Sequence, residues 1–557
     1  MANLMVEMGS VIIAATLLAY FTRLIRQPMV LGYIAAGFII GPYVAGLITS
    51  SETIALLSEL GIAFVLFIVG LEIDFKRIRD CGVNAGIIGT GQVVFTSVVG
   101  FMIAAFFGFT SMESFYIAVA LAFSSTMIVI KLLSDKGVLD TLHGRLILGV
   151  LLIQDVIAIF VLALLPNLSQ SSLQLIALSL AKGVLIFAAA FVAAKTILPA
   201  IFNISARSTE LLFLSAVSWL FAFAFFAEFL GYSIAIGAFV AGVTLASSSY
   251  KLEVVSRVKS LRDFFATVFF VSLGMQLVLP SLGSMLIPVI VFSLFVIIGN
   301  PIIVAVLGMA LGYNKRISIM TGLPIGQVSE FSLIVVALGV SLGHISGNIA
   351  SLIVAVASIT ITATTYVIKH DEMVYRFLKG LFNFSSVGAT ERLPRSRFDV
   401  VLCGYNRIGY IIANKLKDIG KSFLVVDFNP EVVAKLKKEK IPCVYGDLGD
   451  AEFVKKLNIP EAELVISTVP TFYENEMLIN EAKKGRAIAI VTSNQVDTAL
   501  KLYDAGAHYV ILPHFLGGEY VAMLLEKSAH LPSMMQYKFS HIKHLHQRKL
   551  MGHDHPL

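Results

Sequence analysis

About thirteen apolar runs, most of them roughly 17–25 residues long, follow one another through the first 370 residues of the chain. A helical run of this length matches the ~30 Å hydrocarbon core of a bilayer at about 1.5 Å per residue. The chain is therefore expected to cross a membrane many times as α-helices. The predicted spans cover residues 4–22, 28–47, 54–73, 83–107, 113–134, 143–165, 171–199, 208–228, 230–248, 262–280, 285–312, 317–342 and 346–368.

Composition supports a polytopic membrane protein and argues against a water-soluble globule. Hydrophobic residues make up 57% of the 557 residues and charged residues 14%, against about 45–50% and about 25% in soluble domains. The net charge of +6 needs no nucleic-acid partner, since membrane proteins collect Lys and Arg in cytoplasmic loops. Cys81, Cys403 and Cys443 show neither metal-ligand spacing nor a paired framework, so we expect reduced, inert thiols.

The character of the chain changes near Lys369, where an ordinary α/β sequence replaces the apolar runs. We predict a transmembrane domain over residues 1–370, a linker over 371–397, a Rossmann-type domain over 398–527 and a polar tail over 528–557. The tail holds six histidines, among them His541, His544, His546, His553 and His555, which could bind a metal, although we favour a disordered tail without a metal site. We read the first apolar run as a retained helix, because no basic region precedes it and no cleavage pattern follows.

Positive charge alternates between the loops and predicts the orientation. One set of loops is basic, while the opposite set carries Glu52, Glu113 and Glu228 and almost no Lys or Arg. The positive-inside rule places the N-terminus outside and the α/β domain in the cytoplasm of a multi-pass cell (inner) membrane protein. The basic residues are Arg23, Arg26, Lys76, Arg77, Arg79, Lys136, Arg145, Arg207, Lys251, Arg257, Lys259, Arg262, Lys315, Arg316 and Lys369.

Two short similarities indicate an inverted repeat. The second span opens with residues 31–37 (LGYIAAG) and the ninth with 230–237 (LGYSIAIG), while 67–72 (FIVGLE) in the third resembles 271–276 (VSLGMQ) in the tenth. Both pairs are offset by seven spans, and an odd offset puts the two copies in opposite orientations. Inverted repeats with broken helices are typical of secondary transporters, whose binding sites lie near the bilayer midplane.

The predicted interruptions fall at corresponding spans. Ser124, Ser125 and Thr126 interrupt the fifth span, and residues 324–330 (PIGQVSE) interrupt the twelfth. Pro324 removes a backbone donor and Gly326 relaxes the helix, which leaves backbone groups free to hold a charge.

Gln154 and Asp155 form a polar pair deep in the sixth span. A carboxylate at membrane depth costs roughly 2.5–3.5 kcal/mol on insertion scales unless it faces a cavity or a partner. Asp155 is therefore the leading candidate for a functional acid.

The order of these motifs resembles the monovalent cation:proton antiporter-2 family, and among its members the Kef-type potassium efflux antiporters. The resemblance rests on Gln154-Asp155, on residues 326–331 (GQVSEF), on residues 70–72 (GLE) and on the α/β domain, and covers about residues 4–527. It implies alternating access by a moving core against a dimerising panel. Asp155 would bind either a cation, K⁺ in the first place, or a proton.

The resemblance also implies one exchanged cation per proton, because Gln154 stands where sodium-type relatives carry a second Asp. Many relatives place a Lys in the eleventh span where this chain has Asn300, so an Asp–Lys switch is in doubt and a hydrogen bond from Asn300 is the substitute. Burial raises the proton affinity of a carboxylate and a bound cation lowers it, so the two ligands compete. Expected oxygen donors are Ser124, Ser125, Thr126, Gln154 and Asn300, with Glu330 assigned to capping a broken half-helix.

The soluble part follows a dinucleotide-fold pattern. A strand over 397–403 runs into the turn 404–409 (GYNRIG) and a helix to about residue 419, and a second strand over 422–426 ends in Asp427. Further strands around 441–445, 464–467, 487–491 and 509–512 predict a six-stranded parallel sheet.

This part resembles the TrkA-N, or regulator of potassium conductance, domain. The expected nucleotide cleft comprises Gly404, Tyr405, Asn406, Arg407, Ile408, Gly409, Asp427 and Asp447. Arg407 fits the usual turn, whereas Asn406 replaces its second Gly, which leaves open AMP, ATP, NAD(H) or no ligand. Both acids could instead serve helix capping and turns.

Three functional alternatives follow. A Na⁺:proton antiporter and a nucleotide-gated monovalent cation channel remain open, although no TVGYG-like filter is present. An oxidoreductase is disfavoured, because the Rossmann-type part has no catalytic domain beside it. We expect a transporter rather than an enzyme, a homodimer in the lipid bilayer, and regulation in which an accessory subunit is an open question.

Overall fold

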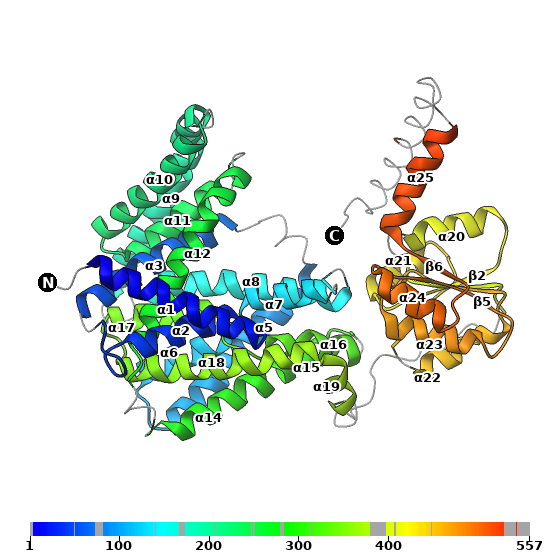
Figure 1. The fold of residues 1–557 in the computed structure, drawn as a ribbon, viewed down its shortest axis with the longest axis horizontal. Coiled ribbons are helices and arrows are strands. Elements are labelled where there is room, and N and C mark those ends of the chain that lie inside the picture. The colour runs from blue at the N-terminus through cyan, green and yellow to red at the C-terminus, as the bar shows by residue number, and fades with distance from the viewer. Residues whose placement is uncertain are drawn as a thin grey trace. The chain divides into compact units, whose positions relative to one another are not determined.

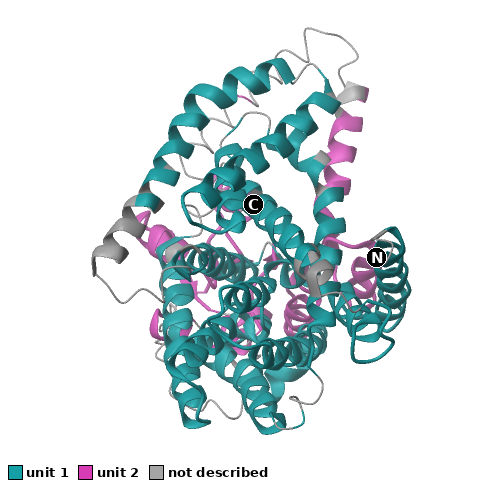
Figure 2. Ribbon diagram, turned by 90° about the vertical axis from the view of Figure 1, so that its left-hand side faces the viewer, with its two compact units in different colours: residues 1–307, 318–382 teal, residues 308–317, 383–557 magenta. Residues whose placement is uncertain are grey.

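The computed structural model describes residues 4–48, 51–72, 82–136, 138–139, 141–165, 173–205, 208–246, 248, 251–278, 283, 285–313, 315–378, 397–405, 408–446, 448–449, 451–527 and 542. The chain forms two compact units, which Figure 2 colours separately. The helical unit comprises residues 1–307 and 318–382, and the sheet unit comprises residues 308–317 and 383–557.

Long helices make up the helical unit and lie across one another in several directions (Figure 1). In chain order they are α1 (Leu4–Leu24), α2 (Met29–Ile40), α3 (Ser51–Glu72), α5 (Gly82–Phe106), α6 (Ser111–Ala122), α7 (Thr126–Asp135), α8 (Leu142–Leu164), α9 (Leu173–Ser205), α10 (Thr209–Phe229), α11 (Ile234–Ala246), α12 (Lys251–Met275), α14 (Leu286–Leu294), the π-helical turn η2 (Phe295–Gly299), α15 (Asn300–Ala310), α16 (Lys315–Gly322), the 3₁₀ turn η3 (Leu323–Ile325), α17 (Glu330–Ser341), α18 (Gly347–Lys369) and α19 (Asp371–Leu378).

Every predicted span coincides with a helix or a broken helix, so the polytopic helical fold is confirmed. Among the described residues, eight helices are long and apolar enough to cross a membrane, and the bent pair 315–325 and 330–341 makes a ninth. Helix α12 begins at Lys251, eleven residues before the predicted start of the tenth span at about residue 262. Counting apolar residues places the bilayer-embedded part of a helix, while charged residues extend the helix beyond it.

Two close helix crossings relate the halves of the unit. A Cβ on Gly37 of α2 would lie 1.9 Å from the Val271 carbonyl oxygen of α12, and one on Gly274 would lie 2.1 Å from that of Ile34. The same arrangement joins α3 and α11, where Cβ atoms on Gly70 and Gly242 would lie 2.4 and 2.0 Å from carbonyl oxygens of the facing helix. Each crossing pairs a span of one predicted repeat with a span of the other. Such pairing of helices from the two halves agrees with the predicted inverted repeat.

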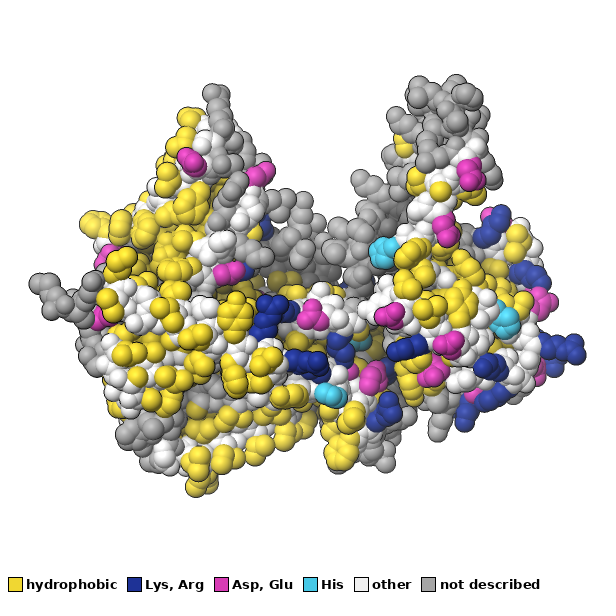
Figure 3. All heavy atoms as spheres, in the orientation of Figure 1, with side chains coloured by type: hydrophobic (Ala, Val, Ile, Leu, Met, Phe, Trp, Pro, Cys, Tyr) yellow, Lys and Arg dark blue, Asp and Glu magenta, His cyan; other side chains and the backbone are white. Residues whose placement is uncertain are grey.

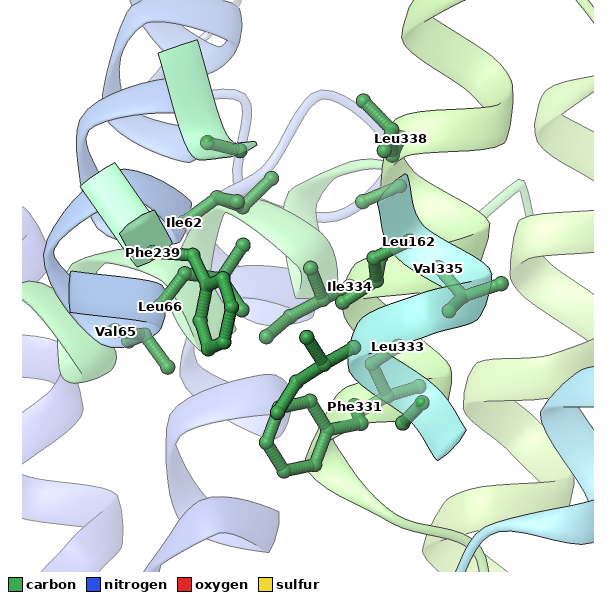
Figure 4. Packing of buried hydrophobic residues seen from close by; sticks show 14 of the residues in the cluster. Ile62, Val65, Leu66, Leu162, Phe239, Phe331, Leu333, Ile334, Val335 and Leu338 are labelled. Atoms are coloured by element: carbon green, nitrogen blue, oxygen red, sulfur yellow. The ribbon is translucent and has the colours of Figure 1, made fainter. Parts of the chain in front are cut away.

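Apolar side chains pack between these crossed helices and the broken ones. Figure 4 shows Leu66 of α3 and Phe239 of α11 on one side, with Phe331 and Ile334 of α17 on the other. All four belong to one buried cluster. The visible face of the helical unit is largely apolar (Figure 3), and side chains such as Phe106 and Phe229 are 87% exposed. Such a surface suits contact with lipid rather than water.

The sheet unit contains the six parallel strands expected from the sequence, in the order β3-β2-β1-β4-β5-β6. This is the Rossmann-type order, with the switch point between β1 and β4. The elements are β1 (Val400–Cys403), α20 (Ile408–Asp418), β2 (Phe423–Asp427), α21 (Pro430–Lys438), β3 (Cys443–Tyr445), α22 (Ala451–Lys456), η4 (Ile459–Glu461), β4 (Leu464–Ser467), α23 (Phe472–Ala482), β5 (Ile488–Thr492), α24 (Val496–Asp504), β6 (Tyr509–Ile511) and α25 (Pro513–Lys527).

Candidate functional site

The first helix break lies between α6 and α7. Helix α6 ends at Ala122, Phe123 is extended, and Ser125 begins α7 as its N-cap. The Ser125 hydroxyl accepts a 3.3 Å hydrogen bond from the Ile128 backbone N–H. Two consecutive serines favour this break because their hydroxyls satisfy backbone groups that a continuous helix would pair.

The second break separates η3 from α17. Pro324 lies in η3, and Ser329 is the N-cap of α17 and accepts a hydrogen bond from Phe331 N–H. Two threonines of α18 bond backbone groups that this break leaves without helical partners. Thr364 donates to the Gly326 carbonyl (2.7 Å), and Thr360 accepts from Val328 N–H (3.2 Å). The cap is therefore Ser329, which corrects the capping role expected of Glu330.

The two breaks meet and are bonded to each other. Ser124 donates a 2.7 Å hydrogen bond from Oγ to the Ile325 carbonyl. Ser125 donates from Oγ to Glu330 Oε1 (2.8 Å), and Gln327 Nε2 donates a longer 3.4 Å bond to the Ser125 carbonyl. The predicted pair of interruptions therefore forms one site at the crossing of four half-helices.

Asp155 of α8 faces this crossing. Thr126, the first residue of α7, donates a 2.9 Å hydrogen bond from Oγ1 to Asp155 Oδ2. Thr126, Asp155 and Glu330 together line one cavity of about 890 Å³. The adjacent hydroxyls of Ser125 and Thr126 thus each bond a different carboxyl group, and both carboxyl groups belong to the wall of one cavity.

The cavity runs from the carboxyl groups toward charged residues on one side only. On the other side, the lining ends at Val65 of α3, Ile159 of α8 and Ile334 of α17. One turn farther along these helices lie buried apolar side chains of the same hydrophobic cluster: Ile62, Leu162 and Leu338 (Figure 4). The charged residues of the lining toward the opening are Arg23, Arg26, Lys131, Asp135, Arg262, Asp263 and Lys369.

Gln154 and Asn300 lie in a buried hydrogen-bonded network and are not part of the cavity lining. Gln154 Oε1 accepts from Ser124 N–H (3.0 Å), and its Nε2 donates to Gln92 Oε1 of α5 (2.6 Å). Asn300 Oδ1 accepts from Thr96 Oγ1 (2.7 Å), and its Nδ2 donates to the Leu121 carbonyl (3.1 Å).

The structure thus divides the predicted ion-site residues into two groups. Thr126, Asp155 and Glu330 reach the cavity, while Ser124, Ser125, Gln154 and Asn300 support the break behind it. Four polar residues support the breaks but were not among the residues predicted from the sequence: Gln92, Thr360 and Thr364 bond the broken backbone directly, and Thr96 joins Gln92 to Asn300. Both pairs are spaced by four residues within apolar runs, a signal that would have placed each pair on one helix face.

In the sheet unit, the predicted phosphate turn joins β1 to α20. Gly404 has φ +85°, and a Cβ on Gly409 would lie 2.0 Å from the Gly404 carbonyl oxygen. Both positions therefore require glycine. Helix α20 begins at Ile408 next to this turn. Asn406, Arg407 and Asp447 lie outside the described residues, as do Cys81 and the tail apart from residue 542.

Asp427 lies at the end of β2 and holds the turn in place. Tyr405 N–H donates to Asp427 Oδ2 (2.9 Å) and Asn429 N–H to Oδ1 (2.8 Å). Asp427 therefore fixes the backbone that follows β1 and β2, which is the turn-forming role. Burial raises the pKa of Tyr405 to about 12 and moves the pKa of the Cys403 thiol above its usual range, so both groups stay neutral.

Broken, cross-bonded helices around a cavity acid are typical of the secondary ion transporter class, and this chain also carries a dinucleotide-type α/β module. The model of the transmembrane sodium/hydrogen exchanger family matches residues 11–370, so the chain belongs to that family. The TrkA-N domain model matches residues 400–513. These matches confirm the recognised combination of an exchanger domain with a C-terminal TrkA-N domain.

Three curated relatives show the range of similarity. The chain is 26% identical to K(+) efflux antiporter 2 of Arabidopsis thaliana, over 86% of this chain and 42% of the relative, so it spans about two fifths of that protein. It is 26% identical to KefC, a glutathione-regulated potassium-efflux system protein of Klebsiella pneumoniae, over 86% and 77% of the two chains. It is 24% identical to the putative cation/proton antiporter YbaL of Escherichia coli, over 90% and 93%.

Two solved structures show partial likeness. The sodium proton antiporter MjNhaP1 of Methanocaldococcus jannaschii has 15% identity and a TM-score of 0.48, over 68% of this chain and 99% of that one. A GsuK channel bound to NAD has 19% identity and a TM-score of 0.20, over 42% of each chain.

Proposed function

We propose that the chain is a monovalent cation:proton antiporter whose physiological cation is K⁺. Family membership and the names of its relatives support exchange of a cation for a proton. The observation that carries the proposal is the cavity at the crossing of the two breaks, with the Asp155 and Glu330 carboxyl groups in its wall.

Competition at Asp155 suffices for exchange. A partly desolvated carboxylate binds either a proton or a cation, and each ligand lowers the affinity for the other. The Thr126 hydroxyl lies 2.9 Å from Asp155 Oδ2, and the Glu330 carboxyl group lines the same cavity. The oxygens of these two side chains would replace part of the hydration shell of the cation. The site can then change its access from one side of the membrane to the other only when a proton or a cation is bound, because an unpaired carboxylate is energetically costly inside the closed protein.

The one-sided cavity supports alternating access over a continuous channel. The basic residues at its opening match the cytoplasmic side under the positive-inside rule. The buried cluster that contains Ile62, Leu162 and Leu338 would have to rearrange in the opposite state. A channel would instead need a path that is open on both sides at once.

We assign a regulatory nucleotide to the sheet unit. Gly404 and Gly409 allow the tight turn that leads into the N-terminus of α20, where a phosphate would bind, and Asp427 at the end of β2 stands where a ribose would lie in such a fold. The nucleotide would be AMP, ATP or NAD(H), and Tyr405, Asn406, Arg407, Ile408 and Asp447 would complete its surroundings. Pairing of two sheet units in a homodimer would let the ligand bias both transport sites.

Cation-dependent pH recovery in reconstituted vesicles tests the function. We expect K⁺ and Rb⁺ to dissipate an imposed pH gradient faster than Na⁺ and Li⁺. Preference for Na⁺ would make the chain a sodium:proton antiporter. Cation current without loss of the pH gradient would establish the channel instead.

A further inference from the structure

The break between α6 and α7 rests on a chain of amide and hydroxyl groups that runs in one direction. Ser124 N–H donates to Gln154, Gln154 to Gln92, and Gln92 to both Thr96 (3.0 Å) and the Ala122 carbonyl (3.1 Å). Thr96 then donates to Asn300, which ends the chain at the Leu121 carbonyl. Four side chains form this series of hydrogen bonds, and all four are completely buried: Gln92, Thr96, Gln154 and Asn300.

The two ends of the chain determine the orientation of every amide in it. A backbone N–H only donates, so Gln154 must turn its oxygen to Ser124 and its NH₂ to Gln92. Gln92 must therefore present its own oxygen to Gln154. Its NH₂ is then left for the Ala122 carbonyl, which lost its helical partner where α6 ends. Gln92 is the only member bonded to two other side chains and to the broken backbone.

Asn300 is the last residue of this hydrogen-bonded series and lies directly after an irregular turn of its helix. The π-helical turn Phe295–Gly299 immediately precedes it, and single π-helical turns are frequent at functional sites. Asn300 both accepts and donates in the chain. An ammonium group at this position could donate to the Leu121 carbonyl but could not accept from Thr96. The support of this break is therefore built from neutral groups.

We propose that Gln92 is a positioning residue of the ion site. It holds the Gln154 amide in the orientation that pairs with Ser124 N–H, and thereby fixes the break that presents Thr126 to Asp155. Thr96 shares this role because its hydroxyl joins Gln92 to Asn300. The inference rests on the proposed function, since it describes how the exchange site is held in shape.

A graded set of variants tests the proposal in reconstituted vesicles. Gln92→Met keeps the volume and removes all hydrogen bonding, and should weaken apparent cation affinity by about tenfold, equivalent to ~1.4 kcal/mol. Thr96→Val should weaken it in the same direction. Thr362→Val is the matched control, because the Thr362 hydroxyl bonds only a carbonyl of its own helix (2.7 Å) and should leave exchange unchanged.

Gln92→Glu supplies a readout that general loss of structure cannot imitate. A protonated carboxyl group can accept from Gln154 and donate to Ala122, whereas a carboxylate cannot donate. This variant should therefore approach the unaltered affinity at acidic pH and lose it as the pH rises, relative to the unaltered protein at each pH. It also decides the case if Gln92→Met fails to insert.

A double-substitution cycle with Gln154→Met completes the test. We expect the second substitution to cost little once the first is made, because both break the same chain. Additive effects, unchanged affinity in Gln92→Met, or a Gln92→Glu profile parallel to that of the unaltered chain would each overturn the positioning role. If the unaltered chain exchanges no cation for protons, the proposed function is wrong and this inference falls with it.

Discussion

Ser125 donates a 2.8 Å hydrogen bond from Oγ to Oε1 of Glu330, 205 positions farther along the chain. This bond joins the start of α7 to the start of α17, and so connects the half-helices of the two inverted repeats. The neighbouring Thr126 makes the corresponding bond to Asp155. Two adjacent hydroxyls thereby bond the two acids of the cavity wall that lie at the crossing, Asp155 and Glu330.

Ser125→Ala should destabilise the protein and slow exchange. Removal of a buried donor leaves Glu330 without this partner, at a cost of about 1–3 kcal/mol. Thermal unfolding in detergent and pH recovery in vesicles measure the two effects. Ser256→Ala is the control, since the exposed Ser256 hydroxyl bonds only Glu253 of its own helix. Equal behaviour of both variants would contradict a linking role for Ser125.

Asp155→Asn should abolish exchange while the protein still inserts and unfolds cooperatively. The amide preserves the shape of the side chain but cannot alternate between a proton and a cation. Asp263→Asn alters another acid of the cavity wall, whose side chain is 63% exposed, and should retain exchange. Substantial antiport by Asp155→Asn in vesicles would sink the assignment of the site.

Exchange by the unaltered chain should be electroneutral. Gln154 and Asn300 are neutral and bonded within the network, so Asp155 is the proposed carrier of the alternating charge. A membrane potential imposed by a permeant-anion gradient should leave the rate of pH recovery unchanged. Gln154→Asp adds a second acid and should make the rate depend on potential. A clear response of the unaltered protein would argue for Glu330 as a second charge carrier in the cavity.

Gly37→Ala should lower the thermal stability of the helical unit or prevent its insertion. The new methyl carbon would lie 1.9 Å from the Val271 carbonyl oxygen, so α2 and α12 must separate. Overpacking of this kind typically costs about 1–3 kcal/mol. Gly9→Ala on α1 meets no atom within 4 Å and should be tolerated. Comparable melting temperatures for both variants would show that α2 and α12 do not approach so closely.

Asp427→Ala should weaken the binding of nucleotides that contain ribose and leave cation selectivity unchanged. The substitution removes the acceptor proposed for the ribose and releases Tyr405 N–H and Asn429 N–H, so the turn also loosens. Nucleotide-dependent shifts in the melting temperature of the solubilised protein measure binding. A chain ending at about Ser396 should still transport but no longer respond to nucleotide. An unchanged response, or no shift at millimolar nucleotide, would refute the regulatory role.

The sequence by itself determined the elements that local chemistry controls. Apolar run length located the membrane-spanning helices, because a helix must cover the hydrocarbon core to cross it. Pro324 and the consecutive Ser124 and Ser125 located the breaks, since they disrupt the backbone pairing of their own helices. The alternation of strands and helices and the glycine turn at Gly404 likewise predicted the parallel sheet.

Only the tertiary structure decided which partners these residues have. Nothing local links Thr96 to Asn300, 204 positions away, or assigns Gln154 to Gln92 instead of to the cavity. A hydropathy pattern describes one helix at a time, whereas a buried polar atom is satisfied by whichever helix packs against it. For the same reason, only packing showed that Glu330 bonds Ser125 in the cavity wall while Ser329 caps the helix.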